Sequence, residues 1–174
     1  MVTITKSVIP NSLTLANLGF GVISVMMSTQ GNYNWAAFYI LMACLADRYD
    51  GQVARYLNVS SELGKELDSL ADLVSFGVAP SILAYHVYGF THLGVLGYLL
   101  VLFLPIAGAY RLARFNVTAF DGAFYGIPIT FAGMFMALYC LVTANYYLAP
   151  LGVTVFLILA LSYLMVCKHR FKKM

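Results

Sequence analysis

The stretch from Trp35 to Tyr56, WAAFYILMACLADRYDGQVARY, joins two segments of opposite character. Its first twelve residues, which end at Ala46, are continuously apolar, whereas the remainder carries Asp47 and Asp50. Twelve helical residues span only about 18 Å, and the hydrocarbon core of a bilayer is about 30 Å thick. A membrane helix that begins near Trp35 must therefore continue through both aspartates toward the membrane–water boundary.

The rest of the chain shares this apolar character. Of its 174 residues, 61% are hydrophobic and only 10% are charged, whereas about a quarter of the residues in soluble domains are charged. Apolar stretches recur along the whole length, which predicts one integral membrane domain over residues 1–174. The short polar start, Met1 to Ser12, shows no cleavage site for a signal peptide, so the first apolar stretch is expected to remain as a helix.

Six segments can each supply the roughly 20 residues that a helix needs to cross a bilayer. Turn-forming residues such as Gly31, Gly89 and Gly122, and Pro150, separate them. The sequence thus predicts an all-α integral membrane protein with six transmembrane helices. Their expected limits are about Ser12 to Ser28, Asn34 to Tyr56, Glu62 to Tyr88, His92 to Arg111, Gly126 to Tyr146 and Pro150 to Cys167.

The basic residues predict how these helices are oriented. If the N-terminus is cytoplasmic, six crossings also return the C-terminus to the cytoplasm, and all ten Lys and Arg residues then lie on that side. The outer connections, near residues 30–34, 89–92 and 145–150, contain no Lys or Arg. Because cytoplasmic loops are enriched in these residues, we expect a multi-pass protein of the cell membrane with both termini in the cytoplasm.

A second polar segment, GKELDSLAD at residues 64–72, precedes another apolar run. Asp47 and Asp50 are spaced i, i+3, and Asp68 and Asp72 are spaced i, i+4, so each pair lies on one face of its helix. Only a short connection separates the two helices, which predicts that they are antiparallel neighbours. Four carboxylates would then meet near the cytoplasmic surface of the membrane.

Four unpaired carboxylates in one place need compensating positive charge. No His or Cys accompanies them, and ligation by carboxylates alone suits hard divalent ions such as Mg²⁺ or Mn²⁺. Mg²⁺ usually binds through few carboxylates together with substrate phosphates, so a diphosphate substrate is the expected partner. The alternative interpretation of the acids is an internal ion-pair network or an ion pathway.

The complete pattern D-x2-D-G-x2-A-R-x8-G-x3-D-x3-D, over residues 47–72, resembles the signature of the CDP-alcohol phosphotransferase family at every fixed position. Members of this family have a six-helix membrane core, so the resemblance covers almost the whole chain. It implies that Asp47, Asp50, Asp68 and Asp72 are metal ligands, with two ions expected, and that Asp72 is also the general base. It further implies a homodimer.

The same resemblance implies a nucleotide site. Its residues in the signature are Gly51, Ala54, Gly64 and Arg55. The three small residues could equally serve close packing between membrane helices. The segment Pro10-Asn-Ser-Leu-Thr14 resembles a Pro-Asn-x-x-Thr element of the family, so Asn11 and Thr14 are candidates for contacts with nucleotide phosphates. Thr14 is equally plausible as a residue of the helix start.

Two segments resemble the phosphatidylserine synthase branch of the family, SELGKELDSLADLVSFGVAP at residues 61–80 and RLARFN at residues 111–116. Phosphatidylglycerophosphate synthases tend to have an arginine near the position of Asn17. Gln52 departs from the serine branch, which often has Arg after the glycine. The branch resemblance implies transfer of a phosphatidyl group from CDP-diacylglycerol to the hydroxyl of L-serine, with release of CMP.

The carboxylate of serine needs a cationic partner. Arg111 and Arg114 are the candidates, because arginine can pair bidentately with a carboxylate, and Asn116 could add a hydrogen bond. The alternative is that both arginines only anchor a helix end against anionic lipid.

Other functions stay open at this point. One is an enzyme of the same family with glycerol 3-phosphate or inositol phosphate as acceptor, and another is a cation transporter that uses the acids as an ion path. A purely structural membrane protein would leave the acids unexplained. The basic segment at residues 168–173 is expected to contact anionic lipid and not nucleic acid.

Overall fold

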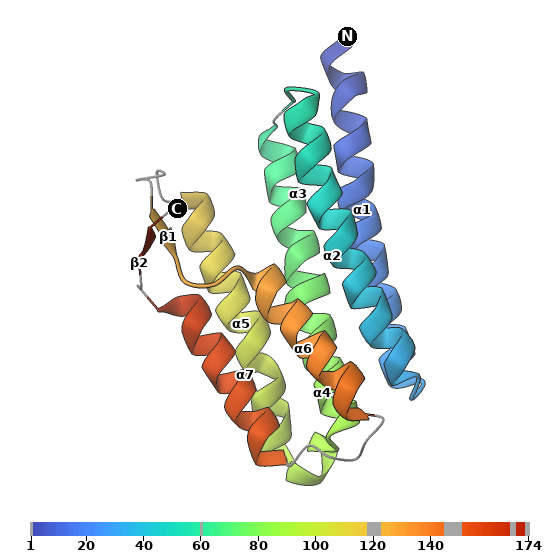
Figure 1. Ribbon diagram of the computed structural model, residues 1–174, viewed down its shortest axis with the longest axis vertical. Coiled ribbons are helices and arrows are strands. Elements are labelled where there is room, and N and C mark those ends of the chain that lie inside the picture. The colour runs from blue at the N-terminus through green and yellow to red at the C-terminus, as the bar shows by residue number, and fades with distance from the viewer. Residues whose placement is uncertain (1, 60, 118–122, 145–150, 168–169, 173–174) are drawn as a thin grey trace.

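Helices make up nearly all of this computed structural model, which describes residues 2–59, 61–117, 123–144, 151–167 and 170–172 (Figure 1). In chain order the helices are α1 (Val2–Thr29), α2 (Tyr33–Tyr56), α3 (Glu62–Asp72), the π-helix η1 (Leu73–Val78), α4 (Ala79–Val87), the 3-10 helix η2 (Phe90–Leu93), α5 (Val95–Val117), α6 (Ile129–Ala144) and α7 (Leu151–Val166). The strands β1 (Ala123–Tyr125) and β2 (Arg170–Lys172) form a short antiparallel pair. The predicted helical class is confirmed, and the strand pair is a feature that was not predicted.

Several helices are apolar enough for a membrane environment. Within the described residues, three helical stretches are long and apolar enough to cross a membrane: Val8–Thr29, Glu62–Val87 and Val95–Val117. α6 and α7 are shorter apolar helices. α2 is long enough, but its second half carries the charged residues of the 47–55 segment. The helices therefore indicate a membrane-associated protein, and the total of six crossings stays a prediction.

Two helices are longer than predicted. α1 begins at Val2 instead of near Ser12, and α5 continues to Val117 instead of ending near Arg111. The predicted limits followed the apolar run, but a helix makes its backbone hydrogen bonds internally and can continue where its side chains become polar. The turns predicted at Gly122 and at residues 145–150 lie outside the described residues.

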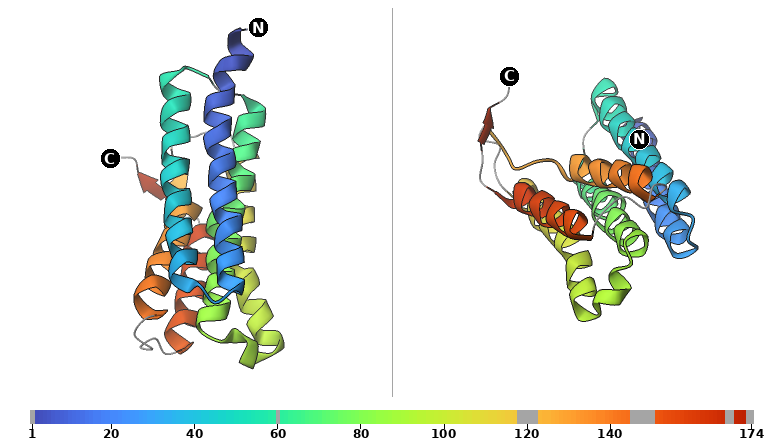
Figure 2. Two further views of the ribbon diagram at one scale, coloured as in Figure 1. Left: turned by 90° about the vertical axis from the view of Figure 1, so that its right-hand side faces the viewer. Right: turned by 60° about the horizontal axis from the view of Figure 1, so that its bottom comes forward.

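The helices pack around a core that includes Ile40, Phe76, Leu104 and Met136. α1 packs along α2 and also contacts α3, α5 lies against α7, and α6 contacts α2 and α4. α2 and α3 run antiparallel as predicted (Figure 1), but they are joined mainly through α1 and have little direct contact with each other. One end of the α1–α2–α3 group projects beyond α5, α6 and α7 (Figures 1 and 2). This projecting end carries the polar segments of α2 and α3.

Small residues allow close packing around η1. A Cβ atom at Gly133 of α6 would overlap the backbone of Phe76, and one at Gly21 of α1 would overlap Ser75. Such residues are the usual means by which membrane helices approach closely. Pro80 follows η1 in the first turn of α4. Because its ring displaces the carbonyl four residues earlier and it has no N–H to donate, a local π-helical turn can absorb the disruption. η1 contacts α1, α5 and α6, which fixes the C-terminal end of α3.

Candidate active site

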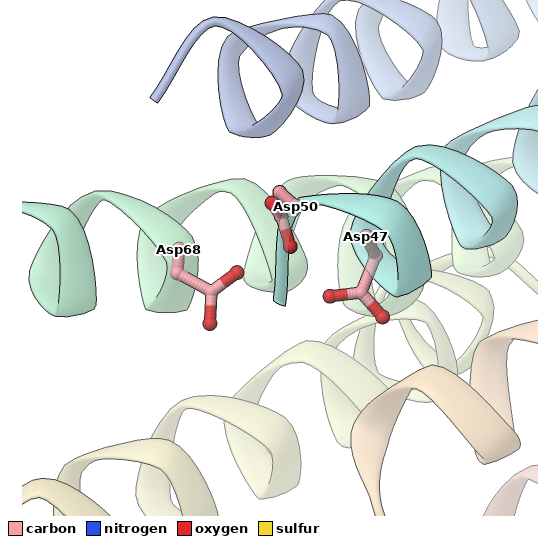
Figure 3. Close-up of side chains that lie close together, drawn as sticks. All are labelled: Asp47, Asp50 and Asp68. Atoms are coloured by element: carbon pink, nitrogen blue, oxygen red, sulfur yellow. The ribbon is translucent and has the colours of Figure 1, made fainter. Parts of the chain in front are cut away.

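Three of the four predicted carboxylates form a compact group. Asp47 and Asp50 come from the second half of α2, and Asp68 comes from α3. One carboxylate oxygen from each lies within 4.8 Å of the other two. Figure 3 shows that the three side chains approach a common space from the two helices. The predicted meeting of the two polar segments is therefore present in the structure.

Asp72, the fourth acid, lies one helical turn beyond Asp68 and is not part of this compact group. Its side chain is only 7% exposed. Its Oδ1 accepts a hydrogen bond of 3.2 Å from the Nδ2 atom of Asn17 in α1, and its carboxyl group is within hydrogen-bonding reach of Asp47. The four acids are thus arranged as a group of three with a deeper neighbour, and α1 supplies the polar contact of that neighbour.

A second residue of α1 supports the acids. Thr14 Oγ1 lies 2.8 Å from Asp50 Oδ2 and 3.1 Å from the carbonyl oxygen of Pro10. The hydroxyl has one proton to donate, and a bond to a carboxylate is the stronger of the two. Thr14 therefore contacts an acidic side chain directly, an interaction that neither predicted role for this residue included.

The donor atoms fit a hard divalent cation. All three members of the compact group are carboxylates, the ligands that Mg²⁺ and Mn²⁺ prefer. Asp68 Oδ1 is buried and, among the residues that the structure describes, has no hydrogen-bond partner. An unpaired buried carboxylate oxygen is costly, and a bound cation would remove that cost. The structure thus supports an acidic group that could hold a metal ion, whereas the identity and number of ions stay predictions.

A cavity of about 420 Å³ opens beside the acids. Its lining residues are Pro10, Asn11, Thr14, Asp50, Gly51, Ala54, Val59, Ser61, Glu62, Gly64, Lys65 and Asp68. They include five of the six predicted nucleotide residues, all except Arg55. Arg55 is exposed and donates from Nε to the carbonyl oxygen of Gly51 at 2.9 Å. It therefore contacts the backbone that borders the cavity.

The first turn of α3 supplies residues of the cavity wall that belong to none of the predicted sites. Ser61 caps the helix by accepting a 3.0 Å hydrogen bond from the backbone nitrogen of Gly64, and Glu62 and Lys65 also line the cavity. A helix N-terminus and a lysine both favour an anionic ligand. The available signal in the sequence was Ser61 at a capping position before a helical segment.

The two glycines of the signature differ in their surroundings. A Cβ at Gly51 would meet only Arg55 Nη2, at 4.0 Å, whereas one at Gly64 would lie 3.0 Å from Ser61 Oγ and 3.2 Å from Asn11 Oδ1. Gly51 therefore leaves open space at the cavity, and Gly64 permits the close approach of Asn11. The surroundings of Gly51 fit a ligand cradle and those of Gly64 fit close packing, and both roles stay predictions.

The three predicted serine-binding residues lie on α5 and face different neighbours. Arg111 is half-buried and within electrostatic reach of Asp72, and its Nε is buried with no hydrogen-bond partner among the described residues. Arg114 donates from Nη1 to the carbonyl oxygen of Val166 at 3.2 Å and lies over the Tyr110 ring, 5.9 Å from its centroid.

Asn116 faces α3. Its Nδ2 atom donates to Ser69 Oγ at 3.0 Å and to Glu66 Oε1 at 3.3 Å. Arg111 thus carries a half-buried positive charge in the neighbourhood of Asp72.

Comparison with known proteins defines the class to which this fold and site belong. The family model for CDP-alcohol phosphatidyltransferase matches residues 7–166. The chain is therefore a member of the CDP-alcohol phosphatidyltransferase family.

Among its relatives, the CDP-diacylglycerol–serine O-phosphatidyltransferase of Bacillus subtilis is 40% identical over 164 residues, which cover 94% of this chain and 89% of the relative. The enzyme of the same name from Helicobacter pylori (strain 26695) is 37% identical over 79% of this chain and 59% of its own length. The archaetidylserine synthase of Methanothermobacter thermautotrophicus is 39% identical over 72% of this chain and 54% of its own length.

Proposed function

We propose that this protein is a metal-dependent CDP-diacylglycerol–serine O-phosphatidyltransferase. The observation that carries the proposal is the group of three carboxylates at the edge of a cavity of about 420 Å³, which five residues of the predicted nucleotide site also line. The Bacillus subtilis relative, which bears this enzyme name, matches 94% of the chain. Residues 1–174 would form a single catalytic membrane domain.

The cavity is the proposed site of the CDP group. Gly51 and Ala54 leave room for the base or the ribose beside α2, and Asn11 offers an amide from α1. Lys65 and the N-terminus of α3 provide positive potential for the diphosphate. Arg55, which bonds to the Gly51 carbonyl oxygen, would support this wall and contribute charge at its outer side.

Asp47, Asp50 and Asp68 would hold a divalent cation, Mg²⁺ or Mn²⁺, and Asp72 would be a further ligand of a two-ion site. When bound, the metal would supply Lewis-acid stabilisation of the diphosphate and of the departing CMP. Thr14 holds the Asp50 carboxylate, and Asn17 holds that of Asp72. Such preset orientation matters because positioning provides much of the catalysis in phosphoryl transfer.

The proposed reaction is a direct displacement at the lipid-side phosphorus. The hydroxyl oxygen of serine forms a bond to that phosphorus, and the bond from the phosphorus to the oxygen that bridges it to CMP breaks. Asp72 accepts the hydroxyl proton as general base, and CMP departs with the bridging oxygen. No covalent enzyme intermediate is expected.

Arg111 is the proposed partner of the serine carboxylate, because its half-buried guanidinium lies within electrostatic reach of Asp72. Arg114 contacts the end of α7 and would contribute at longer range. Asn116 would add a hydrogen bond at the edge of the acceptor site. The proposed place of serine is thus between α3 and α5, beside the general base.

The protein is further proposed to cross the cell membrane six times, with both termini and the active site on the cytoplasmic side. Support comes from the absence of Lys and Arg in the three predicted outer connections and from the projecting end of α1, α2 and α3 (Figure 2). Soluble serine and membrane-bound CDP-diacylglycerol could meet there. A homodimer is proposed on the family resemblance alone.

A panel of acceptors tests the proposal. Purified protein is supplied with CDP-diacylglycerol and Mg²⁺ or Mn²⁺, and CMP release is measured with serine, glycerol 3-phosphate, inositol phosphate or no acceptor. We expect release that depends on serine. Release with glycerol 3-phosphate but not with serine would contradict only the choice of serine as the acceptor. No release with any acceptor would contradict the enzymatic function.

A further inference from the structure

A polar contact joins α3 and α5 one helical turn before Asp72. Glu66 and Ser69 are three residues apart on α3, so their side chains are neighbours on that helix, and Asp72 follows one turn further on. The Nδ2 atom of Asn116 in α5 bonds to both Glu66 Oε1 and Ser69 Oγ, at 3.3 and 3.0 Å. This edge between the two helices therefore carries a carboxylate, a hydroxyl and an amide in mutual contact.

The chemistry of these groups fixes the direction of each hydrogen bond. An ionised carboxylate only accepts, so the nitrogen of the Asn116 amide must be the atom that faces Glu66. Ser69 gives its own proton to the carbonyl oxygen of Lys65 at 3.1 Å, and its oxygen accepts from Asn116. With both N–H bonds of its amide engaged in this way, the oxygen is the side-chain atom through which Asn116 could contact a ligand. Asn116 and Glu66 thus both present acceptors, which suit a cationic group.

A positive charge lies on α5, five residues before Asn116. Arg111 of α5 is within electrostatic reach of Asp72, and its buried Nε has no hydrogen-bond partner among the described residues. Glu66, in contrast, is exposed. Glu66 and Asp72 are six residues apart, which is about 9 Å along the helix axis, and the glutamate side chain can reach across part of that distance. A zwitterion that lies between α3 and α5 would therefore find a cation and an anion at opposite ends.

We infer that Glu66, held by Asn116, binds the ammonium group of the acceptor amino acid while Arg111 binds its carboxylate. The inference rests on the proposed function and extends it, because it explains why an amino acid would be preferred over an acceptor that lacks the ammonium group. Ser69 is a positioning residue that anchors the Asn116 amide. The serine hydroxyl would then approach Asp72, one turn beyond Ser69 on α3.

The test compares serine with 3-hydroxypropionate, which has the same hydroxyl and carboxylate but no ammonium group. The full-length protein and its Glu66→Gln variant are assayed for the KM of serine, the inhibition constant of 3-hydroxypropionate against serine, and the KM of CDP-diacylglycerol. A lost contact between charged groups at an exposed carboxylate predicts a rise of about three- to fivefold in the serine KM. The other two constants are expected to stay within about twofold, since neither ligand uses the lost contact.

Charge reversal at position 66 gives a second test, in which the constants for serine and 3-hydroxypropionate should change in opposite directions. Glu66→Lys should raise the serine KM and lower the inhibition constant of 3-hydroxypropionate, because a new cation repels the ammonium group and attracts a carboxylate. The inference is overturned if the serine KM and the inhibition constant of 3-hydroxypropionate change in the same direction and by the same factor in each variant. That result indicates a purely structural contact between α3 and α5. Unchanged constants in both variants overturn it as well.

These outcomes differ from a failure of the proposed function. If the wild-type protein releases CMP with serine and the Glu66 variants behave like wild type, only the role of Glu66 is wrong. If the wild-type protein releases no CMP with serine, the proposed function is wrong and the role of Glu66 falls with it.

Discussion

The amide of Asn17 donates a hydrogen bond of 3.2 Å to the carboxylate of Asp72, across the contact between α1 and α3. Asn17 is fully buried in α1, and its carbonyl oxygen is bonded to the hydroxyl of Ser75 at 2.9 Å. The backbone of this residue is therefore held by η1 while its side chain holds the proposed general base. The first helix thus has a direct part in the site, although the signature lies entirely in α2 and α3.

We predict that Asn17→Ala lowers kcat by about 10- to 100-fold, because a hydrogen bond to a charged group is lost and Asp72 becomes free to reorient. The KM values should change little, since Asn17 is not among the residues that line the cavity. Steady-state kinetics measure both constants. Ser24→Ala is the matched control, because Ser24 is also a buried polar residue of α1 but bonds to the Ala36 carbonyl oxygen, and it should keep the kcat of wild type. Equal losses in the two variants would show that Asn17 acts only through packing.

The two signature glycines predict opposite effects on stability. Gly51→Ala places its Cβ in open space and replaces a helical glycine, so it should raise the free energy of unfolding by about 0.5–1 kcal/mol. It should also raise the KM of CDP-diacylglycerol, because the methyl group occupies the cavity. Gly64→Ala should lower the thermal unfolding temperature, since its Cβ would lie 3.0 Å from Ser61 Oγ. Thermal unfolding without substrate and the KM of each variant check this pair. An unchanged KM of CDP-diacylglycerol in Gly51→Ala would contradict a role of Gly51 in making room for the nucleotide.

Substitutions of the two arginines of α5 should have different effects on the serine KM. Arg111→Gln is expected to raise the serine KM by about 10- to 100-fold through the loss of a charged contact with the carboxylate. Arg114→Gln should have a clearly smaller effect on that KM, because Arg114 contacts Val166 and Tyr110. It should instead lower the thermal unfolding temperature by weakening the contact between α5 and α7. A larger rise of the serine KM in Arg114→Gln than in Arg111→Gln would indicate that Arg114, and not Arg111, binds the serine carboxylate.

Metal activation should depend on the compact acidic group. Removal of divalent ions by a chelator is expected to abolish CMP release, and added Mg²⁺ or Mn²⁺ should restore it. Asp68→Asn should raise the metal concentration for half-maximal activity by about tenfold or more, because a charged ligand is lost. Thr14→Val, which removes the 2.8 Å bond to Asp50, should raise the same metal concentration by a smaller factor. Thr14→Ser should behave as wild type. Full activity in the presence of the chelator would contradict a metal-dependent reaction.

Much of the architecture could be predicted from the sequence. Apolar length and spacing indicated the helical class, and the i, i+3 and i, i+4 spacings placed the aspartates on shared faces. Five of the six predicted nucleotide residues line one cavity, because the signature and the α1 element converge on the same end of the bundle. These features follow from local geometry, which the sequence pattern records directly.

Other features depend on tertiary packing and had no signal in the sequence pattern. Asn17 is a single buried amide within an apolar helix, so its spacing does not reveal that Asp72 is its partner. The directions of Arg111 and Arg114 depend on how α5 is rotated against α3 and α7. The extension of α1 to Val2 was missed for a different reason, because apolar length limits the part of a helix inside a membrane but not the helix itself.

Metal-dependent transfer of the phosphatidyl group to serine is tested by a product balance with the purified protein, CDP-diacylglycerol, serine and Mg²⁺ or Mn²⁺. We predict that CMP and phosphatidylserine form in equal amounts, that both require serine and a divalent cation, and that Asp72→Asn reduces both rates by about 10²- to 10⁴-fold, the usual contribution of a general base. CMP release without phosphatidylserine would contradict transfer to serine, and unchanged rates in Asp72→Asn would contradict the role of Asp72 as general base.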